Sequence, residues 1–424
     1  MSKPTFIYGR NFLKFLATNN ITIAISSYQS HNILSIGVQN IDNEPDLAIY
    51  LCPILRCMGM ARYKNRLAIS NVGNILIYNN IGETNSVRYG KFTDQYIPRF
   101  RYSASDVDIH DLKITKTGIY FVSATYNCVA MPSFEKTFEP YWIPPWITLT
   151  VDQNDPSKKY LRREDCCHIN GLCCIDDKPK YITSTSKGNV LGHWRTHKSE
   201  GFVYDIQKNE VVCKDLFSPH SPNWYNGKLW ILESGTGYFG YVDFETKSFV
   251  KKIFLPGFLR GMTFHDKFAI ICLSKDRHDH AFKDIPLCEN LRCNGTDSMC
   301  GIRVIDMDTM SVIEEFTFDQ SSGITELYDV ICLPGSRSRI LSESEVDTVD
   351  YYDKMQFNPE MRVKSDIFDV SDCKEPIIVG QLPGQNSSIN KLETPISVKS
   401  TKPVKSTKSN DDDDPYFLPE PVSF

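Results

Sequence analysis

Three histidines draw attention because they occur at the same point of a repeated sequence pattern: His110 in IHDL, His168 in HING and His220 in HSPNW. Neutral imidazole is a common metal ligand, and three converging imidazoles suit a first-row transition metal with positions left open for water and substrate. Nearby Asp111, Asn170 or Ser221 would orient the rings through hydrogen bonds. The pattern predicts a metal centre whose three ligands are these histidines and whose ion is iron, zinc or copper.

The same alignment places Met58, Arg260 and Glu326 at the equivalent points of the other repeats. Arg260 would hold an anionic group of a substrate, and Glu326 would act as a general base or as a fourth metal ligand. A lone histidine at such a place more often bonds a backbone carbonyl than binds a ligand. The shared repeat position is therefore what favours a functional pocket.

Each repeat runs through a short loop, an apolar strand, a turn and a second strand, and the aligned positions lie about 40 to 66 residues apart. Such units are typical of β-propeller blades with inserted loops. The sequence predicts an all-β, six-bladed propeller, with seven blades as the alternative. The innermost strand of each blade lines a central channel, so residues distant in sequence would converge there. Helical patterns are confined to 10–18 and part of 285–293.

The last repeat, from Thr325, contains only its first strand, whereas strands near the N-terminus lack a partner of their own. A ring must close, so the C-terminal strand is expected to complete the N-terminal blade. The propeller is predicted over 1–340, followed by an irregular extension over 341–380. Residues 381–424 are poor in apolar side chains and are predicted to form a disordered tail, which either docks a protein partner or is a plain extension.

The composition excludes several classes of protein. The chain has 424 residues, of which 47 are Lys or Arg and 52 are Asp or Glu, so the formal charge is 47 − 52 = −5. A strongly basic nucleic-acid binder is disfavoured. No run approaches the roughly 18 apolar residues of a membrane span, and no signal peptide is evident. Several of the 14 cysteines lie in strand-like runs, where reduced thiols pack as small hydrophobes, so a cytoplasmic location is expected.

Other groups of reactive residues are ambiguous. The doublets Cys166-Cys167 and Cys173-Cys174 would point to opposite faces of a strand, which argues against one shared ion. Three loop cysteines have a possible zinc-binding role together with His278 or His280, although plain loop thiols explain them better: Cys288, Cys293 and Cys300. The GHWRTH segment, with His193 and His197, reads as a long loop near the channel mouth that either covers a ligand through Trp194 and Arg195 or only packs.

Several long motifs in the same order resemble an uncharacterised, mainly bacterial propeller family, whose members sometimes occur beside tetratricopeptide repeats. They include DIHDLKI (108–114), CHINGLCC (167–174) and ELYDVICLPG (326–335), and the similarity covers about 12–340. The family pattern has histidine at the three positions above, Arg at 260 and Glu-Leu-Tyr-Asp at 326–329. The resemblance therefore adds Asp329 to Arg260 and Glu326 as candidate catalytic residues, and it implies no established reaction.

Three functions remain open at this stage. The leading hypothesis is a metal-dependent oxygenase or hydrolase acting on a small molecule or peptide. The second is a non-catalytic propeller that binds a protein partner, since a fold does not fix a function. The third is a metal-free hydrolase or lyase in which His and Glu act as base and acid, and whose activity would survive chelation.

Overall fold

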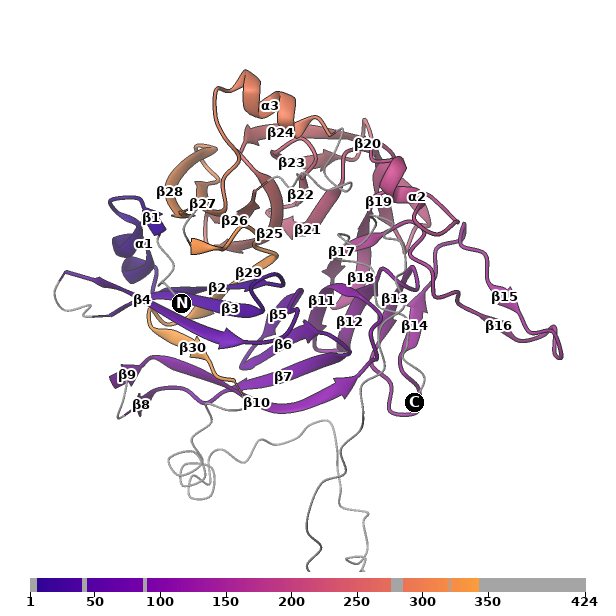
Figure 1. Cartoon of the computed structure of the whole chain (residues 1–424), viewed down its shortest axis with the longest axis horizontal. Coiled ribbons are helices and arrows are strands. Elements are labelled where there is room, and N and C mark those ends of the chain that lie inside the picture. Colours follow the sequence, from indigo (N-terminus) through magenta and orange to yellow (C-terminus); the bar gives the residue numbers. More distant parts are fainter. Residues whose placement is uncertain (1–5, 40–43, 87–89, 276–284, 320–321, 343–424) are drawn as a thin grey trace, which may run out of the picture. The chain divides into compact units, whose positions relative to one another are not determined.

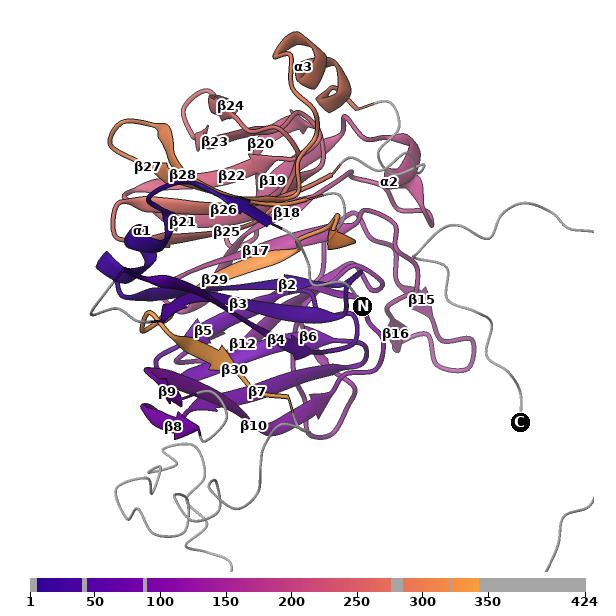
Figure 2. The same cartoon turned by 60° about the vertical axis from the view of Figure 1, so that its left-hand side comes forward.

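The computed structural model describes residues 6–39, 44–86, 90–275, 285–319 and 322–342. Within these residues, the strands form six sheets of four or five strands and two small ribbons. The sheets stand as six blades around a common centre (Figures 1 and 2). The all-β propeller prediction is confirmed, with six blades rather than seven. Apart from residues 341 and 342, the extension predicted at 341–380 and the tail predicted at 381–424 lie outside the described residues.

Three blades are each built from one continuous stretch of chain. From the innermost to the outermost strand, one blade contains β11 (Ile109–Thr115), β12 (Gly118–Ser123), β13 (Cys128–Met131) and β14 (Glu139–Trp142). The next contains β17 (Ile169–Ile175), β18 (Lys178–Ser184), β19 (Gly201–Asp205) and β20 (Glu210–Leu216). The third contains β21 (Pro219–Tyr225), β22 (Lys228–Glu233), β23 (Tyr238–Asp243) and β24 (Ser248–Phe254).

The other three blades each include a strand from a distant part of the chain. In the same order, one contains β25 (Phe258–His265), β26 (Phe268–Ser274), β27 (Gly301–Asp306), β28 (Ser311–Phe318) and β1 (Phe6–Tyr8). The next contains β29 (Asp329–Pro334), β2 (Ile21–Ser27), β3 (Asn32–Gln39) and β4 (Asp46–Pro53). The last contains β5 (Met60–Tyr63), β6 (Arg66–Asn71), β7 (Asn74–Asn80), β10 (Asp94–Ser103) and β30 (Ser338–Ile340).

Short elements lie outside the blades. The ribbons are β8 (Thr84–Ser86) with β9 (Gly90–Phe92) and β15 (Thr150–Val151) with β16 (Lys159–Tyr160), and the helices are α1 (Phe12–Thr18), α2 (His193–Thr196) and α3 (Leu287–Cys293). The predicted helices at 10–18 and within 285–293 correspond to α1 and α3. In the described part of the chain, no helix has the length and apolar character needed to cross a membrane.

The ring is closed by strands from both ends of the described chain. β29 pairs with β2 in antiparallel register from Ile21↔Pro334 to Ser26↔Asp329, as the incomplete last repeat predicted. Two further closing pairs were not predicted: β1 adds to β28, and β30 adds in parallel to β10. Three neighbouring blades are therefore joined through strands from opposite ends of the chain.

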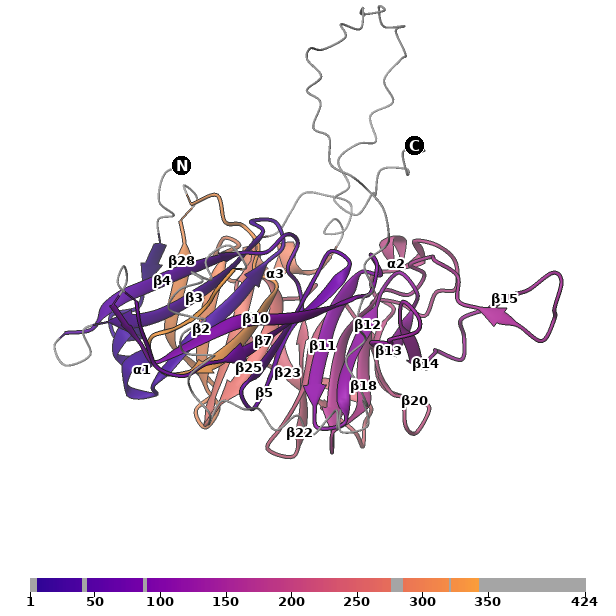
Figure 3. The same cartoon turned by 90° about the horizontal axis from the view of Figure 1, so that it is seen from below.

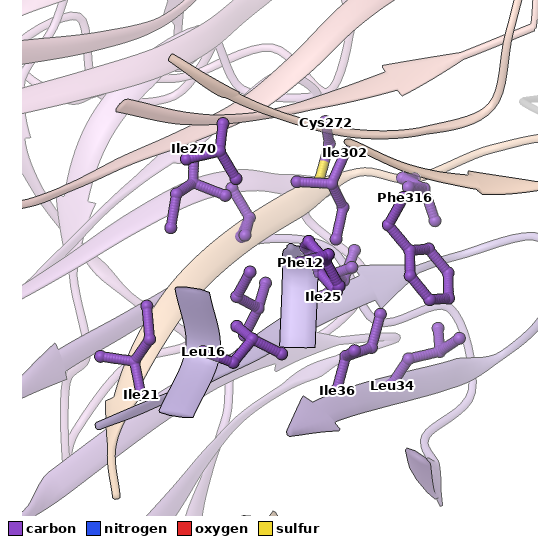
Figure 4. Close-up of a cluster of buried hydrophobic side chains, with 14 of the residues drawn as sticks. Phe12, Leu16, Ile21, Ile25, Leu34, Ile36, Ile270, Cys272, Ile302 and Phe316 are labelled. Atoms are coloured by element: carbon purple, nitrogen blue, oxygen red, sulfur yellow. The ribbon is translucent and has the colours of Figure 1, made fainter. Parts of the chain in front are cut away.

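Apolar side chains fill the spaces between blades. One cluster lies between the β25–β28 blade and the β29/β2–β4 blade, where Ile25 and Ile36 meet Ile270 and Ile302 (Figure 4). α1 covers this cluster with Phe12 and Leu16, which are both fully buried. Successive side chains of a strand point to opposite faces of the sheet. Because neighbouring blades cover both faces of a propeller blade, both faces carry apolar side chains.

Replacing Phe12 by alanine is expected to lower the free energy of unfolding by about 3–5 kcal/mol, because a fully buried ring would leave a cavity. The Phe12 ring also lies 5.5 Å from that of Phe316. The measurement is urea unfolding, compared with Ile7→Ala, since Ile7 is 66% exposed. Equal losses in the two variants would contradict this assignment of the core.

Candidate functional site

Six buried side chains meet near the beginning of the six innermost strands. This axial ring consists of Met58, His110, Asn170, His220, Arg260 and Tyr328, each at most 6% exposed. Contacts between different blades show the convergence. The ring of His110 lies 6.0 Å from that of Tyr328, and Asn170 Nδ2 lies 3.2 Å from His220 Nε2. The axis therefore carries a polar layer made from distant parts of the sequence.

The structure corrects the repeat alignment at His168. Ile109 pairs with Ser123, and Ile169 pairs with Ser184, and in both blades the register shifts at the next residue. The residue equivalent to His110 is consequently Asn170, and His168 lies two positions earlier. The spacing of Ile109 and Leu112 matches that of Ile169 and Leu172, whereas an alignment of histidine with histidine placed His168 two positions out of register.

The same correction applies to Glu326. Asp111 Oδ2 accepts a hydrogen bond of 2.8 Å from the backbone N–H of Leu172, which begins the next blade along the ring. Asp329 Oδ2 accepts one of 2.7 Å from the backbone N–H of Met60, also in the next blade. Asp329 is thus equivalent to Asp111, and Tyr328, not Glu326, is equivalent to His110.

His220 has protein partners at both ring nitrogens. Its Nδ1 lies 2.9 Å from the Ser218 carbonyl oxygen and 2.9 Å from Ser234 Oγ. Its Nε2 accepts a hydrogen bond from the Asn170 amide, so Nδ1 carries the proton. Burial, with the positive charge of Arg260 nearby, lowers the pKa of His220 well below its usual value. The imidazole is therefore neutral and held in place by the protein.

His110 differs because one of its nitrogens is open. Nδ1 lies 3.2 Å from the Asp108 carbonyl oxygen, which favours the tautomer protonated at Nδ1. Nε2 is buried and has no hydrogen-bond partner among the described residues. Burial lowers the pKa of His110 well below its usual value, and the nearby His168 and Arg260 lower it further. A neutral imidazole with a free lone pair thus lies at the axis.

His168 is clamped beside the axial ring. Its Nδ1 lies 2.8 Å from Asp165 Oδ2, and its backbone N–H donates to Asp165 Oδ1 over 3.1 Å. One side of its ring meets His110 edge-on at 4.6 Å. The other side stacks on Trp194, which belongs to α2, at 4.0 Å. Trp194 of the GHWRTH segment thus packs over a side chain that contacts His110. The covering of a ligand by this segment stays a prediction.

Arg260 carries a buried positive charge between two aromatic rings. Its guanidinium carbon lies 5.0 Å from the Tyr328 ring centre and 5.3 Å from that of Phe258. Flanking aromatic faces stabilise a cation that has been removed from water. Glu326 instead faces the turn between β2 and β3, where Oε2 accepts hydrogen bonds from Ser27 Oγ at 3.1 Å and from the Gln29 backbone at 3.2 Å. Its role as a base or ligand stays a prediction.

A second polar layer lies one residue further along the inner strands. Asp111 accepts a hydrogen bond of 2.8 Å from Lys113 Nζ. Burial raises the pKa of Asp329 to about 7, and the negative charge of Asp111 adds to the effect. Burial and the charge of Asp111 therefore both favour the protonated form of the Asp329 carboxyl group.

Two adjoining cavities run along this axis. The smaller one has about 20 Å³ and is lined by His110, His220, Arg260 and Tyr328 among others. That volume holds about one water molecule. The larger has about 360 Å³ and lies at the far ends of the inner strands. The two cavities share four lining residues: Lys113, Asn223, Met262 and Asp329.

His193, His197 and Glu200 each offer one ligand atom, and these three atoms lie within 4.8 Å of one another. Within the described residues, this is the one such group of three His, Cys, Asp or Glu side chains. The three predicted histidine ligands do not form such a group, so their metal-binding role stays a prediction. The sequence signal for the observed group was the spacing of His193 and His197, four residues apart. His278 and His280, weighed as partners of the loop cysteines, lie outside the described residues.

Comparison with known proteins identifies a family but no reaction. A family model described as a domain of unknown function (DUF4915) matches residues 10–341. No curated protein matches the chain. Among solved structures, a chain of a nidogen/laminin complex has a TM-score of 0.43 and 8% identity, and the match covers 75% of this chain and 99% of that one. A protein of unknown function from Bacteroides caccae has a TM-score of 0.40 and 10% identity, and the match covers 74% of this chain and 99% of that one.

Proposed function

The chain belongs to the family described as a domain of unknown function (DUF4915), and we propose that it binds a small anionic molecule at the axial ring, where His110 Nε2 accepts a hydrogen bond from it. The observation that carries this proposal is the buried Nε2 atom, which has no hydrogen-bond partner among the described residues. A buried polar atom left unpaired costs about 1–3 kcal/mol. A ligand that donates a hydrogen to Nε2 would remove that cost.

The choice of an anion rests on Arg260. Arg260 is 6% exposed and lines the same small cavity as His110. Guanidinium groups bind carboxylates through paired hydrogen bonds, and these bonds strengthen away from water. An anionic group near Arg260 would also offset the effect of that cation on the imidazoles. We therefore favour a carboxylate.

The cavity sizes favour a small ligand. A space of about 20 Å³ beside His110 holds little more than one reacting group. The rest of the molecule would extend into the adjoining cavity of about 360 Å³, which is lined by Arg62, Lys113 and Asp329. With His110 as a neutral hydrogen-bond acceptor and Asp329 as a buried carboxyl group whose pKa is raised, this arrangement favours a metal-free lyase or hydrolase over a metal enzyme.

The direct test is calorimetric titration of untagged, metal-free full-length protein with acetate, lactate, succinate, malate and inorganic phosphate. We expect at least one carboxylate to bind, and His110→Phe and Arg260→Met each to weaken that binding at least about tenfold. His193→Ala, outside the axial ring, serves as the control. Equal affinity in all variants, or no binding by any probe, would overturn the proposal. The histidine ¹⁵N shifts of His110 supply a second readout, since binding should move its Nε2 signal.

The metal hypothesis predicts a different result. If His110, His168 and His220 held iron, zinc or copper, the purified protein would contain metal, and His110→Phe would release it. Such a result would replace the metal-free proposal. For a non-catalytic interaction platform, none of the axial substitutions would change the binding of a partner.

A further inference from the structure

We propose that His193, His197 and Glu200 form a site for a divalent transition metal of the zinc class, separate from the axial ring. These residues lie in and just after α2, in the connection between β18 and β19. In Figure 3, α2 lies at the rim of the blades on the same side as α3. The proposal does not depend on the axial function, because no residue is shared between the two sites.

The geometry brings three ligands of two types together. The three residues each offer one ligand atom, and these atoms lie within 4.8 Å of one another. His193 Nε2 lies 3.0 Å from Glu200 Oε2, and the two imidazole rings stack with their centres 3.7 Å apart. A modest movement of these side chains would place an ion between them in place of the direct His193–Glu200 contact.

The hydrogen bonds fix which nitrogen of His197 is available. Its Nδ1 lies 2.9 Å from the His193 carbonyl oxygen, which makes Nδ1 the donor and leaves Nε2 with a lone pair. Two imidazoles and one carboxylate are a ligand set that zinc binds with a fourth position open to water. Histidines four residues apart on one helical turn present their rings on one side, as in known zinc motifs. Hard cations such as calcium would prefer oxygen ligands.

The surrounding backbone holds this segment in place. Gly192, at φ 70°, begins α2, and its N–H donates to the Asp165 carbonyl oxygen over 2.8 Å. Gly188 packs so closely against His193 that a Cβ there would lie 2.4 Å from the His193 Cβ. Asp165 also binds His168, so the segment and the neighbour of the axial ring share one anchor.

Metal binding would therefore fix the cover of the axial ring. Trp194 lies between His193 and His197 in the sequence and is 6% exposed. It stacks on His168, whose ring in turn meets His110. An ion that joins His193, His197 and Glu200 would restrict the turn that carries Trp194. The consequence is a structural role for the metal, expressed as a more rigid indole over His168.

The test uses metal-stripped, untagged full-length protein titrated with zinc chloride and, separately, nickel chloride. We expect about one equivalent to bind with a dissociation constant of about 10 µM or tighter. His197→Ala and Glu200→Gln should each weaken binding at least about tenfold. His110→Phe and the pair Cys288→Ser with Cys293→Ser are matched controls, since these sites offer the competing imidazole and exposed thiols. Circular dichroism checks that each variant is folded.

Two kinds of result would overturn the proposal. One is the absence of saturable binding up to about 100 µM of either metal. The other is binding that survives His197→Ala but disappears in His110→Phe or in the cysteine variant, because the ion would then belong elsewhere. Loss of carboxylate binding in the axial variants, with metal binding intact, would separate failure of one proposal from failure of the other. Metal-induced change in Trp194 fluorescence, absent in Trp194→Phe, is expected as an independent readout.

Discussion

Gly261→Ala should lower the free energy of unfolding by about 3–5 kcal/mol and weaken ligand binding at the axial ring. Gly261 adopts φ 64°, which is unfavourable for any residue with a Cβ. A Cβ there would also lie 2.6 Å from Asp329 Cα and 2.9 Å from the Tyr328 carbonyl oxygen. These are backbone atoms, so β25 and β29 would have to move apart at the point where Arg260 meets Tyr328.

Gly227→Ala separates the two causes. Gly227 has φ 73° in the turn between β21 and β22, but no atom lies within 4 Å of a Cβ placed there. Gly227→Ala should therefore lower the free energy of unfolding by about 1–2 kcal/mol, which is the cost of the left-handed backbone alone. Urea unfolding of both variants measures the difference. Equal losses would show that β25 can accept a side chain at position 261.

Acidification below about pH 6.5 should destabilise the protein through His110 and His220. Both pKa values are lowered, chiefly by burial and by the neighbouring cations, so the folded protein keeps these imidazoles neutral while the unfolded chain takes up protons. The unfolded state then binds more protons, and its free energy falls relative to the folded state as the pH falls. Each histidine contributes up to about 1.4 kcal/mol per pH unit, so two units of acidification make this a large effect.

Two carboxyl groups near the axial ring, those of Asp108 and Asp329, stabilise the folded protein on acidification, which opposes the effect of the histidines. Burial raises the pKa of Asp108 to about 6 and that of Asp329 to about 7, from a usual value of 3.8. These groups bind more protons when folded, so their stabilising contribution is present at low pH and is lost as the pH rises through about 6 and 7. Lys113 also faces Asp329, and Arg56 faces Asp108, which moderates both shifts.

The comparison that isolates the histidines is His220→Asn against wild type, with urea unfolding measured from about pH 5 to about pH 8. The variant should show a shallower loss of stability on the acid side. Met58→Leu, a change in the same axial ring without a titrating group, should shift the whole curve and keep its slope. An unchanged acid slope in His220→Asn would contradict the neutral, buried imidazole.

The fold was predictable because blade strands carry their signal locally. Runs such as ITIAIS and FAIICLS are apolar on both faces, as a strand between two neighbours requires, and the incomplete last repeat pointed to ring closure. The register of the axial ring was less accessible. The alignment matched histidine with histidine, whereas the strand pairing shows that Asn170, not His168, is the equivalent of His110.

Tertiary contacts explain what else the sequence left open. β1 and β30 are three residues each, and only their docking on β28 and β10 makes them strands. The GHWRTH segment was predicted either to cover a ligand or only to pack, and the approach of Glu200 to its histidines depends on the path of the chain after α2. Arg260 was aligned with the axial ring correctly, whereas its neighbour Tyr328 comes from another blade and could not be assigned from spacing.

The pairing of β29 with β2 has a consequence for synthesis on the ribosome. β2 emerges early, yet its partner, which carries Asp329, is among the last of the described segments to be made. Until then, the nascent chain presents an unpaired strand edge from Ile21 to Ser26, the kind of edge that invites aggregation or a chaperone. A product terminated before Thr325 would retain His110, His220 and Arg260 but lack Tyr328 and Asp329. The axial ring therefore comes into existence only when translation has passed its final blade strand.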